Sequence, residues 1–117
     1  MKDFAHSVLT KLKQEYPLPV EIYMTCYNKA TLTARGQCTA YAYVDRRTHV
    51  AFIHTALKQP MARILNTVAH EYYHCIQKYI LDQPDKHPEL ESEANKFASE
   101  YTLKYLKEYN RSLKCDM

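Results

Sequence analysis

Residues 67–76 read TVAHEYYHCI, and the rest of the chain is best interpreted outward from them. They contain His70, Glu71 and His74 in the pattern H-E-x-x-H, which brings two histidines to one side of a helix. Because the pattern fixes only three residues, it also arises by chance. The residues around the pattern therefore decide whether it marks a metal-binding site.

A helix is predicted from about residue 60 to 81, with Pro60 in the first turn, where its missing N–H is tolerated. At about 100° per residue, His74 lies about 40° from His70, so both histidines share a polar face. The opposite face is apolar and is predicted to pack on the sheet. It consists of Met61, Ile64, Leu65, Val68, Tyr72, Cys75 and Tyr79.

The two histidines are spaced to bind one metal ion. Their Cβ atoms would lie about 6 Å apart, close enough for both imidazoles to reach zinc at about 2.0–2.1 Å. A lone histidine is more often a core or surface residue bonded to the backbone. His70 and His74 on one face, with Glu71 between them, favour one Zn²⁺ per chain.

A catalytic zinc ion needs a third protein ligand. The longer pattern H-E-x-x-H-x-x-G-x-x-H would supply a histidine from the same segment. It fails here because Gln77 and Ile80 occupy its glycine and third histidine positions. The third ligand is therefore expected from the last predicted helix, at about residues 88–109.

Glu91 is the predicted third ligand, because it shares a helix face with Ala98 that suits close packing on another helix. Glu93, on the outward side, is the first alternative, and His87, in the preceding loop, is the second. Asn95 follows Glu91 by one turn on the same face. It is expected either to hydrogen bond a ligand histidine and fix its tautomer, or simply to face the crevice between the helices.

The segments around these helices predict an α+β fold. Residues 3–15 have apolar side chains at helical spacing and are followed by Pro17. Runs rich in Val, Ile, Thr and Tyr predict three strands, at 20–26, 39–45 and 48–54. The short connection between the last two predicts a hairpin. The expected fold is an N-terminal helix, a small three-stranded, mainly antiparallel sheet, the H-E-x-x-H helix and a C-terminal helix.

Length and composition narrow the possible classes of protein. The 117 residues are expected to form one domain, residues 1–117, with a core at about 20–109. The single glycine, Gly36, excludes glycine-rich phosphate-binding loops. The net charge of +3 comes from scattered residues, which argues against a nucleic-acid partner. The oligomeric state is not predicted.

The four cysteines indicate the compartment. Cys26, Cys38, Cys75 and Cys115 form no C-x-x-C pair and no zinc-ribbon spacing. The chain has no signal segment at its start and no apolar stretch long enough to span a bilayer. A cytoplasmic protein without membrane contact is predicted, and a Cys26–Cys38 disulfide stays open as an alternative.

The stretch RILNTVAHEYYHCIQ (63–77), followed by ELESEANKFASEY (89–101), resembles the gluzincin zinc metallopeptidases. Within them it resembles the compact minigluzincins and the catalytic domain of the ImmA/IrrE family. The resemblance implies His70, His74 and Glu91 as zinc ligands and Glu71 as the catalytic carboxylate. It also implies a small α+β fold.

In this family the substrate cleft usually lies beside an edge of the sheet. Here the candidate edge is the third strand, where a peptide would add as an extra antiparallel strand. Its candidate substrate-contacting residues are His49, Val50, Ala51, Phe52 and Ile53. Known family members cleave phage or stress-response repressors, so a regulatory or repressor protein is the substrate that the resemblance implies.

The predicted function is that of a zinc metalloendopeptidase, which hydrolyses a protein substrate with metal-activated water and Glu71 as general base. One alternative is a zinc-containing peptide-binding or regulatory module with little or no proteolytic activity. Another is a structural zinc site, closed by a fourth protein ligand. The oxyanion donor is also open. The candidates are Tyr72, Tyr73, Tyr101, Tyr105, His54 and His87, with Tyr72 disfavoured by its place on the apolar face.

Overall fold

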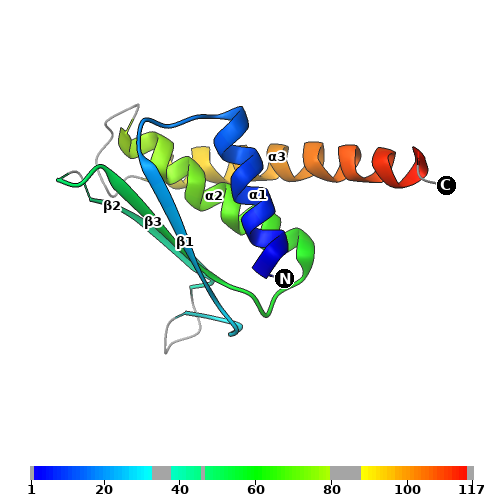
Figure 1. Cartoon of the computed structure of the whole chain (residues 1–117), viewed down its shortest axis with the longest axis horizontal. Helices are drawn as coiled ribbons and strands as arrows, with labels where there is room; N and C mark the ends of the chain where they lie inside the picture. Colours follow the sequence, from blue (N-terminus) through cyan, green and yellow to red (C-terminus); the bar gives the residue numbers. More distant parts are fainter. Residues whose placement is uncertain (1, 33–37, 46, 80–87, 116–117) are drawn as a thin grey trace.

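The computed structural model describes residues 2–32, 38–45, 47–79 and 88–115, and the side chains of the last helix as far as residue 108. Within these residues the architecture is α+β, with three helices and a three-stranded sheet, as predicted (Figure 1). α3 extends past its expected end at residue 109. The elements are α1 (Lys2–Glu15), β1 (Glu21–Tyr27), β2 (Ala40–Asp45), β3 (Val50–Ala56), α2 (Met61–Tyr79) and α3 (Pro88–Cys115).

The sheet is mixed and has the strand order β1-β3-β2. β2 and β3 pair antiparallel, with Ala40 opposite Thr55 and Asp45 opposite Val50, and form the predicted hairpin. β1 lies parallel to β3, with Glu21 opposite Val50. This parallel pair joins strands that are distant in the sequence, so no local turn pattern indicates it.

The predicted position of β3 at the edge of the sheet is wrong. Val50, Ala51, Phe52 and Ile53 lie in the central strand, whose backbone pairs with β1 on one side and β2 on the other. His49 lies just before the strand, at a φ of 57°. The parallel entry of β1 fills the side of β3 that a hairpin alone would leave open. Among the described strands, the edges of the sheet therefore belong to β1 and β2.

The described helices pack on one face of the sheet (Figure 1). Side chains alternate along the strands, so Ile22 and Met24 of β1 and Ala51 and Ile53 of β3 point into the core. α2 contacts β2 and β3 and also packs on α1 and α3. Its predicted apolar face is buried, except that Met61 is exposed and Tyr79 is half-buried.

α1 is held in place by an apolar stripe and by its C-terminal end. The stripe has the spacing of one helix face. Pro17, which cannot continue the hydrogen-bonding pattern of a helix, follows α1 by two residues. The hydroxyl of Tyr72 in α2 donates to the carbonyl of Tyr16, which fixes the end of α1 to the middle of α2. The buried residues of the stripe are Ala5, Val8, Leu9 and Leu12.

The other face of the sheet carries rings that stack across the strands. Phe52 stacks on Tyr23 and Tyr43, with ring centroids 6.0 Å and 5.0 Å away. His54 stacks on Tyr41 at 4.5 Å. Because these rings partly cover one another, cross-strand stacking stabilises a sheet face on which no described helix packs.

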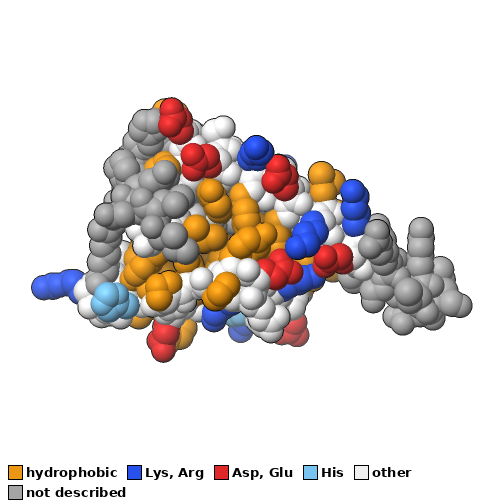
Figure 2. Space-filling view, turned by 90° about the horizontal axis from the view of Figure 1, so that it is seen from above, with side chains coloured by type: hydrophobic (Ala, Val, Ile, Leu, Met, Phe, Trp, Pro, Cys, Tyr) orange, Lys and Arg blue, Asp and Glu red, His pale blue; other side chains and the backbone are white. Residues whose placement is uncertain are grey.

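The outer surface has mixed polarity. Figure 2 shows hydrophobic side chains gathered at the centre of one face, with acidic and basic side chains around them. Ion pairs join α1 to α3, with Lys11 Nζ 2.5 Å from Glu108 and Lys104 Nζ 3.6 Å from Glu15. Such exposed pairs contribute little to stability. None of the described helices is both long and apolar enough to cross a bilayer.

Candidate metal centre

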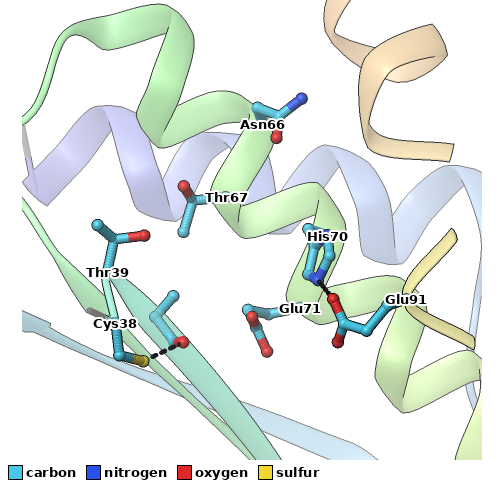
Figure 3. Close-up of a pocket in the computed structure, with 8 residues that line it drawn as sticks. Cys38, Thr39, Asn66, Thr67, His70, Glu71 and Glu91 are labelled. Carbon is cyan, nitrogen blue, oxygen red and sulfur yellow. Dashed lines mark hydrogen bonds and ion pairs between the residues drawn. The ribbon is translucent and has the colours of Figure 1, made fainter. Parts of the chain in front are cut away.

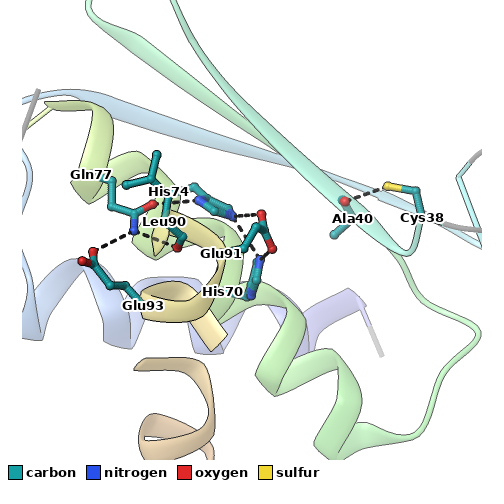
Figure 4. Close-up of polar contacts among 8 residues, drawn as sticks. All are labelled: Cys38, Ala40, His70, His74, Gln77, Leu90, Glu91 and Glu93. Carbon is teal, nitrogen blue, oxygen red and sulfur yellow. Dashed lines mark hydrogen bonds and ion pairs between the residues drawn. The ribbon is translucent and has the colours of Figure 1, made fainter. Parts of the chain in front are cut away.

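Two helices bring three possible metal ligands together (Figure 4). His70 and His74 lie one turn apart on α2, and Glu91 lies in the first turn of α3. The Nε2 atoms of the two histidines are 3.0 Å apart. The carboxylate of Glu91 is 3.3 Å from His70 Nε2 and 2.9 Å from His74 Nε2.

These distances fit the geometry of a zinc site. With bonds of about 2.0–2.1 Å, neighbouring ligand atoms of a tetrahedral zinc ion lie about 3.4 Å apart. The measured separations of 2.9–3.3 Å are slightly shorter. A set of two imidazole nitrogens and one carboxylate oxygen also matches the donors of catalytic zinc sites, which keep a fourth position open.

The electrostatics of His70 favour its neutral form. Burial lowers the pKa of its imidazole, and the nearby His74 lowers it further. Glu91 and a hydrogen bond with Asn95 oppose this shift without cancelling it. The neutral imidazole is the form that binds a metal ion, so His70 can bind one without first losing a proton.

Glu71 is buried beside these ligands, with 9% of its surface exposed. The pKa of its carboxyl group is raised to about 7, mainly by burial; His74 and Lys78 lower this pKa, and the negative charge of Glu91 raises it. A carboxyl group with a pKa near neutrality can both accept and return a proton at physiological pH. Glu71 therefore has the acid–base properties of a general base.

Glu71 opens onto a cleft of about 320 Å³ between α2 and the start of β2 (Figure 3). His70 and Glu91, two of the three candidate metal ligands, also line this cleft. The other lining residues are Cys38, Thr39, Ala40, Asn66 and Thr67. The start of β2 and the His70–Glu91 pair therefore line the same cleft.

Of the other residues predicted for the site, one contacts a candidate metal ligand, one lies outside the ligand group and one lies outside the described residues. Asn95 makes a side-chain hydrogen bond with His70. Glu93 accepts a hydrogen bond from Gln77 at 3.3 Å and is not part of the ligand group found among the described residues. His87, the second alternative ligand, lies outside the described residues.

None of the described candidates for the oxyanion donor lines the cleft. Tyr72 is buried and bonded to the carbonyl of Tyr16. Tyr73 stacks on the ring of Phe97 at 4.7 Å. His54 lies 2.9 Å from the hydroxyl of Tyr27, in the ring cluster on the other face of the sheet. Tyr101 and Tyr105 contact each other's rings between α1 and α3.

Several residues at the site were not predicted. Gln77 is polar, lies on the histidine face of α2 and is nevertheless buried, with 1% exposed. Its spacing of three residues from His74 was the available sequence signal. Thr67 and Asn66 precede the histidines by one turn, which is a second signal of the same kind. Cys38 and Thr39 reach the cleft only through the tertiary fold.

The three cysteines whose side chains the structure describes are free. Cys38 donates its thiol hydrogen to the carbonyl of Ala40 at 2.8 Å. Cys26 and Cys75 are also unpaired, so the alternative of a Cys26–Cys38 disulfide is not found. Burial raises the pKa of Cys75 to about 12, which makes it an unreactive core residue and not a ligand.

Comparisons of the chain with family models, with curated proteins and with solved structures each found no match. The arguments about function therefore rest on the residues and on their geometry.

Proposed function

We propose that this chain is a zinc-dependent peptidase that hydrolyses a peptide bond of a protein substrate. The observation that carries the proposal is the convergence of His70, His74 and Glu91 at one end of a cleft that Glu71 also lines. A structural zinc site would need a fourth protein ligand, and the described residues offer a group of three.

Each side chain has a definite part in this proposal. His70, His74 and Glu91 hold the metal ion, and a bound zinc ion supplies Lewis acidity that polarises a carbonyl and acidifies water. Glu71 accepts a proton from the attacking water and later returns it to the departing amine. Asn95 holds His70 in position through its hydrogen bond.

The peptide substrate is proposed to pair with β2 and not with β3. Thr39 and Ala40 at the start of β2 line the cleft. β2 pairs with β3 on one side only, so its other side offers backbone groups to a further strand. A peptide added antiparallel there would enter the cleft that Glu71 and His70 also line. We also propose a cytoplasmic location, where the free thiols of Cys26, Cys38 and Cys75 are stable.

The test is metal content by mass spectrometry on the purified wild type, His74→Ala, Glu91→Gln and Glu71→Gln, each then given an unstructured protein substrate. We expect one zinc per chain in the wild type and in Glu71→Gln. We expect its loss from the two ligand variants, since two remaining ligands bind zinc weakly. Cleavage should occur in the wild type alone, because Glu71→Gln keeps the metal but removes the base.

Two outcomes would count against the proposal. Unchanged zinc in Glu91→Gln would remove Glu91 from the ligand set. Zinc in the wild type, with no cleavage of any substrate tested and the same peptide affinity in Glu71→Gln, would favour a peptide-binding module, since binding alone does not need a general base.

A further inference from the structure

Gln77 makes three polar contacts although its side chain is buried (Figure 4). Its Oε1 lies 2.8 Å from Nδ1 of His74. Its Nε2 lies 3.0 Å from the carbonyl oxygen of Leu90 and 3.3 Å from a carboxylate oxygen of Glu93. Burying an amide group costs folding free energy unless its donors and acceptors are paired. The three contacts of Gln77 therefore offset the cost of burying its side chain.

The partners of Gln77 fix the orientation of its amide group. The carbonyl of Leu90 and the carboxylate of Glu93 are both acceptors, so the NH₂ group must face them. The amide oxygen must therefore face His74. Because this oxygen can only accept, Nδ1 of His74 must carry a hydrogen and donate it.

The orientation of the amide group in turn fixes the tautomer of His74. In a neutral imidazole with its hydrogen on Nδ1, the lone pair is on Nε2. Nε2 is the atom that lies 3.0 Å from Nε2 of His70 and 2.9 Å from the carboxylate of Glu91. When the ring of His74 is neutral, the lone pair of Nε2 thus points toward the other candidate ligands.

Gln77 also acts on the third candidate ligand. Leu90 and Glu93, which accept its two N–H hydrogens, flank Glu91 in the first turn of α3. One side chain of α2 therefore holds both the ring of His74 and the helical turn that carries Glu91. Substituting it should disturb two of the three candidate ligands together.

We propose that Gln77 is a positioning residue of the metal centre, which fixes His74 in its Nδ1–H tautomer and holds Glu91 against α2. The proposal rests on the zinc site proposed above. Residues that hydrogen bond metal ligands typically contribute about 10–100-fold to metal affinity, so removing this contact should have an effect of that size.

The first measurement is the tautomer of His74 in the metal-free protein, from nitrogen-15 NMR of the imidazole side chains at mildly alkaline pH. We expect Nδ1–H in the wild type and in Gln77→Glu, which keeps an oxygen acceptor in the same place. Gln77→Met, similar in length but without an acceptor, should lose this preference. Cys75→Ala is the matched control, because it alters the buried side of the same helix without touching His74.

The second measurement is the zinc dissociation constant of the same variants, by competition with a chelator. We expect binding about 10–100-fold weaker in Gln77→Met, partial recovery in Gln77→Glu and an unchanged value in Cys75→Ala. The proposal is overturned if the wild type has His74 as Nε2–H, if Gln77→Met keeps the wild-type tautomer, or if its zinc affinity is unchanged.

The tautomer measurement separates this proposal from the proposed function, because it needs neither zinc nor a substrate. If the wild type fails to bind zinc, the peptidase proposal falls, and so does the claim that Gln77 serves a metal centre. If zinc binds and no peptide is cleaved, the role of Gln77 stands while the catalytic role fails. Circular dichroism of each variant shows whether a loss of zinc affinity reflects unfolding.

Discussion

Glu71 is acidic, yet it is buried at the wall of the cleft, and burial raises the pKa of its carboxyl group to about 7. In the unfolded chain the same group ionises near 4.5, the ordinary pKa of a glutamate side chain. Ionisation is therefore less favourable in the folded state. In the role proposed for Glu71, the raised pKa favours proton transfer but destabilises the fold, which is a common conflict at functional sites.

This conflict predicts how the stability of the metal-free protein depends on pH. Below the unfolded pKa both states are protonated, and Glu71 has no pH-dependent effect. As pH rises from about 4.5 to 7 the unfolded state ionises first, so stability falls, and above the folded pKa the loss is complete. For a pKa shift of this size, the free energy of unfolding falls by roughly 3 kcal/mol in total.

Urea unfolding of the metal-free wild type and of Glu71→Gln at several pH values measures this effect. The difference between the two free energies of unfolding should grow in favour of Glu71→Gln across that pH range. A constant difference would show that the carboxyl group of Glu71 has the same pKa in both states. Titrating groups that do not interact with Glu71 are common to both proteins and cancel.

Tyr72 gives a second prediction for a single residue. Its hydroxyl donates to the carbonyl of Tyr16, and its ring is fully buried. Tyr72→Phe keeps the ring but leaves that carbonyl without its partner, which should cost about 1–2 kcal/mol of folding free energy. Thermal unfolding should show the loss. Zinc affinity should be unchanged, because Tyr72 lies on the side of α2 away from the histidines.

At the scale of elements, β2 is the strand whose free edge meets the cleft. The amide of Ala56 donates to the carbonyl of Thr39, so Thr39 and Tyr41 direct their backbone groups toward β3. Ala40, between them, directs its backbone groups away from β3, toward the side where a peptide would pair. A proline at position 40 would remove a donor to the peptide while leaving the ladder with β3 intact.

We therefore expect Ala40→Pro to fold and to cleave a peptide at least about tenfold more slowly, mainly through a higher KM, since one backbone hydrogen bond contributes about 1.4 kcal/mol when it is lost on binding. Tyr41→Pro is the matched comparison. It removes a donor within the sheet and should lower the free energy of unfolding by about 1–3 kcal/mol. Unchanged KM in Ala40→Pro would place the substrate elsewhere.

At the scale of the whole molecule, the candidate ligands connect α2 to α3. His70 and His74 come from one helix and Glu91 from the other, and the segment between the two helices includes residues 80–87. A metal ion held by all three would bind the folded state and not the unfolded chain. Zinc binding should therefore stabilise the fold as a whole.

The size of this stabilisation can be stated in advance. With free zinc at 100 times its dissociation constant, the gain is about 2.7 kcal/mol, which for a domain of this length raises Tm by roughly 10 °C. Differential scanning calorimetry with zinc and with EDTA measures the shift. Glu91→Gln should show a much smaller shift, and an equal shift in that variant would mean that the bound zinc does not contact Glu91.

Local patterns in the sequence predicted much of the fold, because they depend on neighbours along the chain. The spacing of His70 and His74 follows from the helical repeat, and the same repeat predicted that Glu91 would face α2. The helices, the strands and the β2–β3 hairpin lie close to their predicted positions, except that α3 continues past residue 109 to Cys115. These features need no knowledge of the partners that each element packs against.

The tertiary structure alone decided the features that depend on contacts between distant segments. β1 pairs directly with β3, although β2 lies between them in the sequence. This pairing puts β3 at the centre of the sheet and β2 at the edge beside the cleft. The burial of Glu71 and Gln77 likewise depends on what packs around α2 and not on residues nearby in sequence. Helical periodicity says which way a side chain points. Only packing determines whether water reaches that side chain. Packing therefore also sets the pKa of Glu71 and the hydrogen bonds of Gln77.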